Sequence, residues 1–284
     1  LEFLESMSGS GRLSLCVYMS CLVLSFPRDF RYGWDLRRKA HRDLLDKIDK
    51  RLPCLVEFWA PRCSPWSVST VMKDAAKLEA SRQAEVPSLH WVSQRLRKVY
   101  KDGRASILEN PRSSAILKSS PLKSVSHHGS QAHLDQCQYG ALDPSTGVAV
   151  KKPTFLHLIN IKLPRLYLKC QGDSKCSEHS VLQGSFPGTS INKTAAAAVY
   201  PWPMVTAIVH DLHEHVCTGV VKDGVELLYT HLWNCARCQH GLHKKLSDGS
   251  SEATAPHTSV AGCRFAPSRL GQVPQRGVPD AADG

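Results

Sequence analysis

The stretch CLVEFWAPRCSP, residues 54–65, decides the fold that we expect for this chain of 284 residues. Residues 54–60 form a short run rich in Leu, Val, Phe and Trp, which is typical of a buried strand. The run begins directly after Pro53 and delivers Cys63 just beyond its own end. We expect Cys54 in the core, because free cysteine is among the most buried residue types. Cys63, by contrast, is placed to act as a nucleophile.

A second reactive side chain follows another predicted strand. The apolar residues 105–108 end in Glu109-Asn110-Pro111. Because ligands of α/β sheets bind outside the carboxyl ends of the strands, we expect Cys63 and Glu109 to face one crevice. A thiolate can attack a carbon, and a carboxylic acid can pass a proton to a ring nitrogen. Attack on a pyrimidine ring needs that pair of groups.

The rest of the first 216 residues alternates predicted helices and strands. Apolar runs predict strands at residues 1–4, 21–26, 54–60, 105–108 and 155–161, and periodic patterns predict helices at 13–19, 41–52, 89–101 after an N-cap at Ser88, and from Pro203. Residues 68–87 are expected to form a loop and helix over the cleft, and 143–147 a turn. The polar segment 111–135 is interpreted as a mobile or solvated loop. The alternation predicts an α/β fold, a parallel sheet with helices on both faces.

A glycine loop near the start fits a cofactor site. The segment ESMSGSGRL, residues 5–13, lies between a predicted strand and a predicted helix, a layout in which backbone N–H groups can approach a nucleotide-like cofactor. Gly9 and Gly11 would permit that approach, although a simple turn is the alternative for so short a motif. An acid after the second strand commonly takes ribose hydroxyls, and either Asp29 or Asp35 fits.

Four pieces occur in an order that resembles one family. They are the glycine loop, the Cys63 loop, the Glu109-Asn110 pair, and the block QCQYG at 136–140 followed by KKPT at 151–154. Over roughly residues 1–216 this resembles the C5-cytosine methyltransferases, most closely their phage-like and mobile-element-borne branch. The resemblance implies a Rossmann-like methyltransferase sheet. It implies catalytic roles for Cys63, Glu109 and Asn110, and S-adenosylmethionine held by Glu5, Gly9, Gly11, Asp29 and Asp35.

The chain departs from that family at two points. Arg62 stands where the family usually has the proline that stiffens the nucleophile loop, and its charge could lower the pKa of the thiol. A Gln-x-Arg-x-Arg block is missing. The alternatives to an active enzyme are therefore a degenerate copy from a retrotransposon-type polyprotein and a zinc-containing nucleic-acid-binding protein with an inactive domain. A secreted disulfide protein is a more distant alternative.

Positive charge gathers around the Glu-Asn pair. The net charge is +11, which favours a polyanionic partner, DNA more than RNA, over a merely basic soluble protein. Residues 91–124 hold eight Lys and Arg against two acids, which places +6 of the +11 there. Nothing in the sequence indicates a membrane or an obligate protein partner. We expect phosphate contacts from four residues: Arg104, Arg112, Lys151 and Lys152.

The cysteines indicate a reducing compartment and a metal. Eleven scattered cysteines, an odd number, favour reduced thiols in the nucleus or cytoplasm. The spacing Cys235-x2-Cys238-x18-His257-x5-Cys263 predicts a zinc module at 217–265, with His240 and His243 as competing ligands. His210 and His213 on the last predicted helix are better interpreted as part of a solvated face than as a metal pair.

The two ends of the chain carry weaker signals. Residues 266–284 are poor in apolar side chains and are expected to be disordered. The apolar stretch 13–26 is too short to span a bilayer and is not followed by a cleavage site, so we interpret it as a buried helix and strand. The chain begins with Leu1 rather than Met, which favours a fragment of a longer protein.

Overall fold

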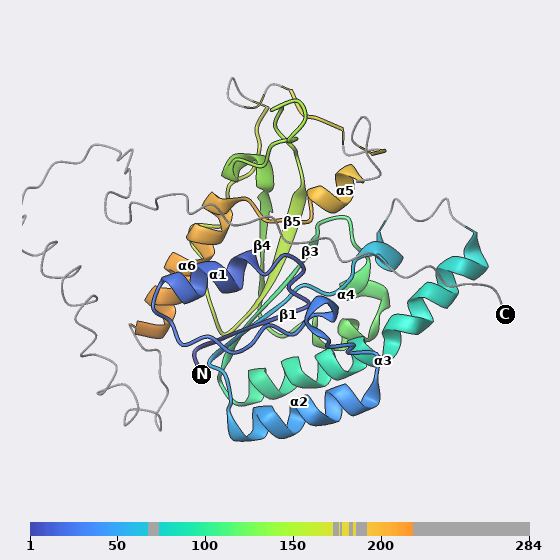
Figure 1. Ribbon diagram of the computed structural model, residues 1–284, viewed down its shortest axis with the longest axis vertical. Coiled ribbons are helices and arrows are strands. Elements are labelled where there is room, and N and C mark those ends of the chain that lie inside the picture. The colour runs from blue at the N-terminus through green and yellow to red at the C-terminus, as the bar shows by residue number, and fades with distance from the viewer. Residues whose placement is uncertain (68–73, 173–175, 177, 182–183, 186–191, 218–284) are drawn as a thin grey trace, which may run out of the picture. The chain divides into compact units, whose positions relative to one another are not determined.

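The fold is an α/β sheet with helices on both faces, in a computed structural model that describes residues 1–67, 74–172, 176, 178–181, 184–185 and 192–217 (Figure 1). These residues belong to one compact unit, 1–224. The predicted zinc module and tail, residues 217–284, lie outside the described residues apart from Cys217, and the predicted boundary at 216 stays a prediction.

Five strands form one mixed sheet in the order β1-β2-β3-β5-β4. They are β1 (Phe3–Ser6), β2 (Val56–Trp59), β3 (Ala105–Pro111), β4 (Ser130–Asp135) and β5 (Pro153–Ile159). β1, β2 and β3 run parallel, as predicted, whereas β5 is antiparallel to both β3 and β4. The expected parallel sheet is therefore wrong in its second half. β5 follows β4 through a connection that holds a 3₁₀ helix but no α-helix, and a parallel crossover usually needs such a helix.

The predicted strand at 21–26 is instead an irregular segment along the edge of β1. It makes isolated bridges from Leu24 to Phe3 and from Arg28 to Ser6. Backbone hydrogen bonds such as Ser25 N to Phe3 O, 2.8 Å, and Arg28 N to Glu5 O, 3.0 Å, hold it there. The segment therefore covers the free edge of β1 without forming a regular ladder.

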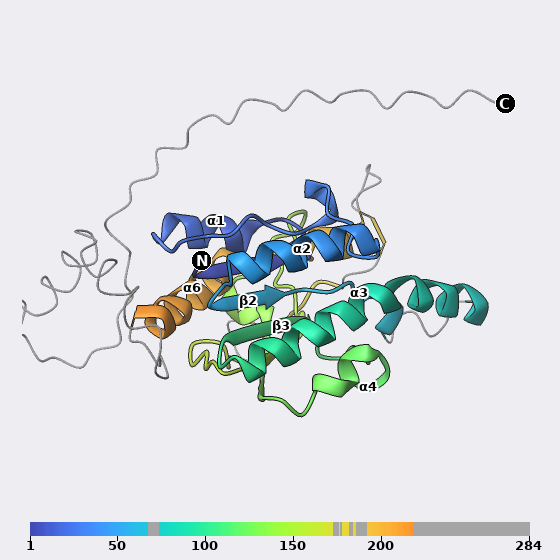
Figure 2. The same ribbon diagram turned by 90° about the horizontal axis from the view of Figure 1, so that it is seen from below.

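Two pairs of helices cover opposite faces of the sheet (Figures 1 and 2). α1 (Arg12–Met19) packs with α6 (Trp202–Cys217) on one face. On the other face lie α2 (Lys39–Arg51) and α3 (Ala75–Lys101), where the Trp91 indole donates to Asp46 across 2.9 Å. None of the helices in the described part of the chain is long and apolar enough to cross a membrane.

The helix α3 and the segment after β3 differ from the prediction. α3 begins after Asp74 and continues through Pro87, so Ser88 is not an N-cap; its hydroxyl donates to the Glu85 carbonyl instead. The predicted loop 111–135 contains α4 (Ile116–Ser119), the 3₁₀ helix η4 (Pro121–Val125) and β4. The segment has few apolar side chains, which is why its sequence indicates a loop. Three of them, Ile116, Leu122 and Val125, are nevertheless fully buried in the core that the segment shares with α3.

Side chains along each strand point alternately to the two faces of the sheet, so that a core forms on each face. Trp59 on β2 meets Trp91 of α3 edge to face, with ring centroids 5.7 Å apart. The neighbouring Phe58 points to the other face, where Tyr200 lies 6.1 Å away, just before α6. Successive residues of a strand face opposite sides, so each short strand supplies both cores at once. Cys54 is 2% exposed, and burial raises the pKa of its thiol to about 11, as expected of a core residue.

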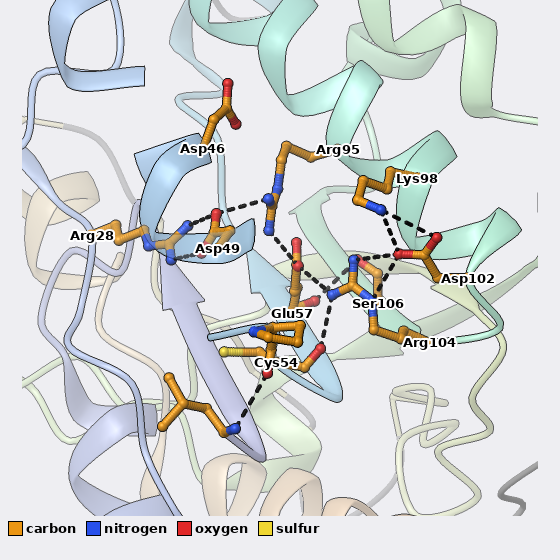
Figure 3. A network of polar contacts seen from close by, with 12 residues as sticks. Arg28, Asp46, Asp49, Cys54, Glu57, Arg95, Lys98, Asp102, Arg104 and Ser106 are labelled. Atoms are coloured by element: carbon orange, nitrogen blue, oxygen red, sulfur yellow. Dashed lines mark hydrogen bonds and ion pairs between the residues drawn. The ribbon is translucent and has the colours of Figure 1, made fainter. Parts of the chain in front are cut away.

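A chain of buried ion pairs links the elements on the α2/α3 face (Figure 3). Asp49 of α2 binds two guanidinium groups. One belongs to Arg28, in the segment along β1, and the other to Arg95 of α3, across 2.8 Å. Arg95 also donates to Glu57 of β2 across 2.6 Å, and Arg104, before β3, reaches the same carboxylate oxygen at 2.8 Å. The Glu57 side chain is 0% exposed. Breaking such a pair leaves an uncompensated charge in the interior.

We predict that Glu57→Gln costs about 3–5 kcal/mol of unfolding free energy, because two buried guanidinium groups lose their shared charge. The measurement is urea unfolding followed by circular dichroism. The matched control is Asp43→Asn, which breaks the exposed Lys39–Asp43 pair and should cost less than about 0.5 kcal/mol. Equal unfolding midpoints for the two variants would contradict the structural role of Glu57.

Candidate active site

The carboxyl ends of β2 and β3 bring the predicted nucleophile and acid together. Cys63 lies four residues beyond β2 and begins the 3₁₀ helix η2 (Ser64–Trp66), where its carbonyl accepts from Trp66 N at 2.9 Å. The Asn110 side chain donates to the Pro61 carbonyl at 3.1 Å. Asn110 therefore ties the Cys63 loop to the end of β3, which is a positioning role compatible with the predicted one.

Glu109 is buried next to two further polar groups. It is 6% exposed, with the Tyr200 hydroxyl and the Lys152 ammonium as its neighbours. Burial raises the pKa of the Glu109 carboxyl, against the lowering effects of Lys152 and of the Tyr200 hydrogen bond. The carboxyl is thus held in a form that retains its proton more readily than an exposed glutamate.

Cys63 is half-buried, and its thiol interacts electrostatically with Glu109. Burial and the Glu109 charge raise the pKa of the Cys63 thiol, while Lys152 and Arg62 lower it by less. Arg62 thus lowers the pKa of the thiol, as expected, but burial and Glu109 outweigh it and the net shift is upward. The Arg62 guanidinium turns to Ser64, at 2.8 Å, and to Glu85, at 3.4 Å.

The two halves of the downstream block meet beside this crevice. The Gln136 side chain donates to the Thr154 hydroxyl at 3.0 Å, and its backbone N–H donates to the Lys152 carbonyl at 3.2 Å. Lys152 in turn donates to the Ala197 carbonyl and lies 5.8 Å over the Tyr200 ring. Lys152, predicted to contact phosphate, is thereby held among the groups around Glu109.

The glycine loop joins β1 to α1 as predicted. Gly9 and Gly11 both have positive φ, and a side chain at Gly11 would collide with the Tyr32 hydroxyl. Glu5, at the end of β1, accepts from the backbone N–H and the hydroxyl of Ser14 in α1 at 2.8 and 2.5 Å. Its other oxygen, Oε1, is buried and has no hydrogen-bond partner among the described residues. Burial raises the pKa of Glu5 to about 7.

An open pocket of about 400 Å³ lies outside the ends of β1 and β2. Asp29 is fixed at its wall by the Gly9 N–H, 3.1 Å away, whereas Asp35 is engaged by both side-chain nitrogens of Arg37. Both candidates for the ribose contact therefore line one cavity. Six of the lining residues define its position: Met7, Asp29, Phe30, Asp35, Ala60 and Arg62.

The other predicted phosphate contacts are scattered. Arg104 precedes β3, at the opposite end of the strand from Glu109, and its guanidinium is taken up by Glu57 and Asp102. The expected phosphate contact of Arg104 is corrected here, because the Arg104 side chain is only 12% exposed. Arg112 directly follows β3, is 40% exposed and lies 3.7 Å from Asp135. Lys151 is exposed next to Lys152.

The predicted zinc ligands cannot be placed, whereas an unpredicted cluster can. Cys235, Cys238, His257 and Cys263 lie outside the described residues. Within the described part, a different Cys₃His group could hold a metal ion, formed by Cys137, Cys170, Cys176 and His179. On α6, Asp211 and Glu214 bind Arg165.

Tyr200 is the site residue that sequence reasoning missed. Its ring is 5% exposed, and burial together with Glu109 and Glu5 raises the pKa of its hydroxyl well above the usual value. The signal was the run Tyr200-Pro201-Trp202-Pro203 before a predicted helix, which marks a rigid entry into that helix. Nothing in that run indicates that the ring reaches β3, because the two are far apart in sequence.

No protein-family model matches the chain, and no curated protein matches it significantly. The function therefore has to be argued from the site itself.

We predict that stability falls as pH rises through the pKa of Glu5. A carboxyl with a pKa of about 7 in the fold, against 4.5 when unfolded, binds its proton more tightly in the folded state. Its contribution is complete below pH 4.5 and is lost as pH rises through 7, at a cost of up to about 3 kcal/mol. Urea unfolding from pH 5 to 8.5 should show a smaller loss in Glu5→Gln than in the wild type. Parallel pH profiles would contradict this assignment.

Proposed function

We propose that the chain is an S-adenosylmethionine-dependent methyltransferase acting on C5 of cytosine in nucleic acid, DNA rather than RNA. The observation that carries the proposal is the meeting of Cys63 and Glu109 at the carboxyl ends of adjacent parallel strands. The chemistry of a pyrimidine ring supports it, because C6 is opened to a nucleophile when N3 receives a proton. In this proposal the α/β sheet is a Rossmann-like methyltransferase sheet.

The groups around the glycine loop fit the proposed cofactor. The unpartnered Glu5 Oε1 would accept from the ammonium of its amino-acid end, and Gly9 and Gly11 permit close backbone approach. Asp29 or Asp35 would take the ribose hydroxyls; both carboxylates already accept hydrogen bonds, Asp29 from the N–H groups of Gly9 and Arg31 and Asp35 from Arg37. When bound, S-adenosylmethionine supplies the methyl group.

Cys63 forms the covalent bond in the proposed mechanism. Its thiol first loses a proton to water, and Sγ then adds to C6 of the cytosine. The Lys152 ammonium favours the thiolate, while burial and an ionised Glu109 oppose it. A protonated Glu109 removes that repulsion, so the acid and the nucleophile are electrostatically compatible when Glu109 is neutral.

Glu109 supplies the proton that makes C6 reactive. Its raised pKa keeps a proton available for N3, and once Sγ has added to C6 the electron pair of the former C5–C6 double bond makes C5 nucleophilic. The Tyr200 hydroxyl lies within hydrogen-bonding reach of the Glu109 carboxyl and orients it. After methylation, a base such as water takes the C5 proton, the C5–C6 double bond re-forms, Cys63 leaves as the thiolate, and N3 returns its proton to Glu109.

The nucleic acid must present its target base outside the helix. C6 of a stacked cytosine is out of reach of a side chain at the bottom of a crevice, so a duplex substrate would have the base flipped out. The exposed Lys151 and Arg112 both lie at the end of the β3–β5 pair that carries Glu109 and would contact phosphate. Arg104 is not part of the proposed interface.

We predict a covalent adduct between this chain and DNA that contains 5-fluorocytosine, in the presence of S-adenosylmethionine. A base can remove a proton from C5 but cannot remove fluorine in the same way. The Cys63–C6 bond therefore does not break, and a denaturation-resistant band should shift on a gel. Glu109→Gln should slow its formation by about 10²–10⁴-fold, because glutamine has no proton to transfer.

Cys63→Ala should abolish the adduct, whereas the control Cys21→Ser should retain it, since Cys21 is an exposed cysteine outside the crevice. An adduct that survives in Cys63→Ala would rule out the mechanism. The absence of any adduct from folded wild-type protein would favour the alternative, a decayed, zinc-containing nucleic-acid-binding protein of mobile-element origin.

A further inference from the structure

Three cysteines and one histidine converge beside β4, away from the candidate active site. The ligand atoms of Cys137, Cys170, Cys176 and His179 all lie within 4.8 Å of one another. His179 Nε2 is 3.5 Å from the Cys170 sulfur and 2.9 Å from the Cys176 sulfur. Around a tetrahedral zinc with Zn–S of about 2.3 Å, neighbouring ligand atoms are about 3.5–3.8 Å apart. The group therefore needs to open only slightly to enclose the ion.

The backbone fixes the first two cysteines independently of any metal. Cys137 lies in the 3₁₀ helix η5 (Gln136–Tyr139), and Asp135, just before it, donates its N–H to Leu168 at 3.0 Å. The Asp135 carboxylate accepts from the N–H of Cys170 at 3.0 Å. These two bonds clamp the chain before Cys170 to the chain before Cys137, so the two sulfurs start out as neighbours.

The other two ligands come from one short segment. Cys176 and His179 are separated by two residues, the spacing at which one turn presents two ligands to one ion. Ser180, next to His179, donates its N–H to Ala149 at 2.8 Å and its hydroxyl to Asp143 at 2.6 Å. The segment is thus anchored on its far side, and its ligands face the two fixed cysteines.

The described residues of this segment are mostly exposed. Of its described residues between Gln171 and Asn192, Cys176 is the one that is buried, at 3% exposed. A chain that buries so little apolar surface does not offset its loss of conformational entropy. A zinc ion bound by four protein ligands would supply that missing stabilisation, as structural zinc sites do.

We propose that Cys137, Cys170, Cys176 and His179 form a structural zinc site. Three thiolates and an imidazole complete a tetrahedral shell, so no position remains open for a substrate or a catalytic water. The site would fix the connection between β5 and the segment that carries Tyr200. It is distinct from the zinc module predicted at 217–265, and it does not depend on the methyltransferase proposal.

The test uses the full chain and removes the predicted second module first. In a Cys235→Ser/Cys238→Ser background, the purified protein should retain one zinc per chain by elemental analysis. Adding Cys176→Ser to that background should remove it, whereas adding Cys21→Ser, at an exposed cysteine elsewhere, should not. Absence of zinc in the background, or zinc that survives Cys176→Ser, would overturn the proposal, as would a disulfide between two of the three cysteines.

A variant that preserves the site guards against simple misfolding. His179→Cys offers four thiolates, so it should keep the ion. After cobalt replaces the zinc, the background protein should show the absorption bands of tetrahedral coordination, and His179→Cys should strengthen the thiolate-to-cobalt band. Identical cobalt spectra with and without the His179 substitution would exclude His179 as a ligand.

Discussion

The buried chain of charges from Arg28 to Arg104 is the constraint on which the rest of the fold depends. Each charge in it has been taken out of water, and each is tolerable only while its partners stay in place. Through Asp49, Arg95 and Glu57 the chain connects the covered edge of β1, both helices of one face, β2 and the start of β3. A shift in the register of any of these elements would leave an unpaired charge in the interior.

This constraint acts at one end of the sheet, and the candidate active site lies at the other. Glu57 is on β2, whose far end delivers Cys63, and Arg104 precedes β3, whose far end carries Glu109. Fixing where the parallel strands begin therefore fixes where they end. The crevice itself needs few charges: burial raises the pKa of Cys63, Glu109 and Tyr200, and Lys152 is the cation that acts on both the thiol and the carboxyl.

The sequence predicted those parts of the fold that local patterns decide. Short apolar runs that end in polar residues predicted β2 with Cys63 and β3 with Glu109. Helical periodicity predicted α1, α2 and α6. The antiparallel β5 was not predictable, because strand direction depends on the route of the chain through 111–152. Pro87 hid the continuity of α3 with the helix expected within 68–87, since proline in a helix interior removes a hydrogen bond and tertiary packing must override it.

Contacts between distant residues account for most of what was missed at the sites. Lys152 was taken for a phosphate ligand because its charge was visible and its neighbour Tyr200 was not. Arg104 was taken for another because Glu57, its buried partner, is 47 positions away. Cys137 and Cys170 meet through a backbone clamp at Asp135 that no local spacing reveals, whereas the pair Cys176-x2-His179 was a visible clue.

The central claim is that Cys63 and Glu109 together activate C5 of a cytosine, and loss of the C5 hydrogen tests it most directly. DNA carrying tritium at C5 of cytosine would be incubated with the protein and S-adenosylmethionine, and tritium released to water would be counted. The account predicts release in step with methyl incorporation, and none from Cys63→Ala. Folded protein that releases no tritium, or releases it equally without Cys63, would contradict the account.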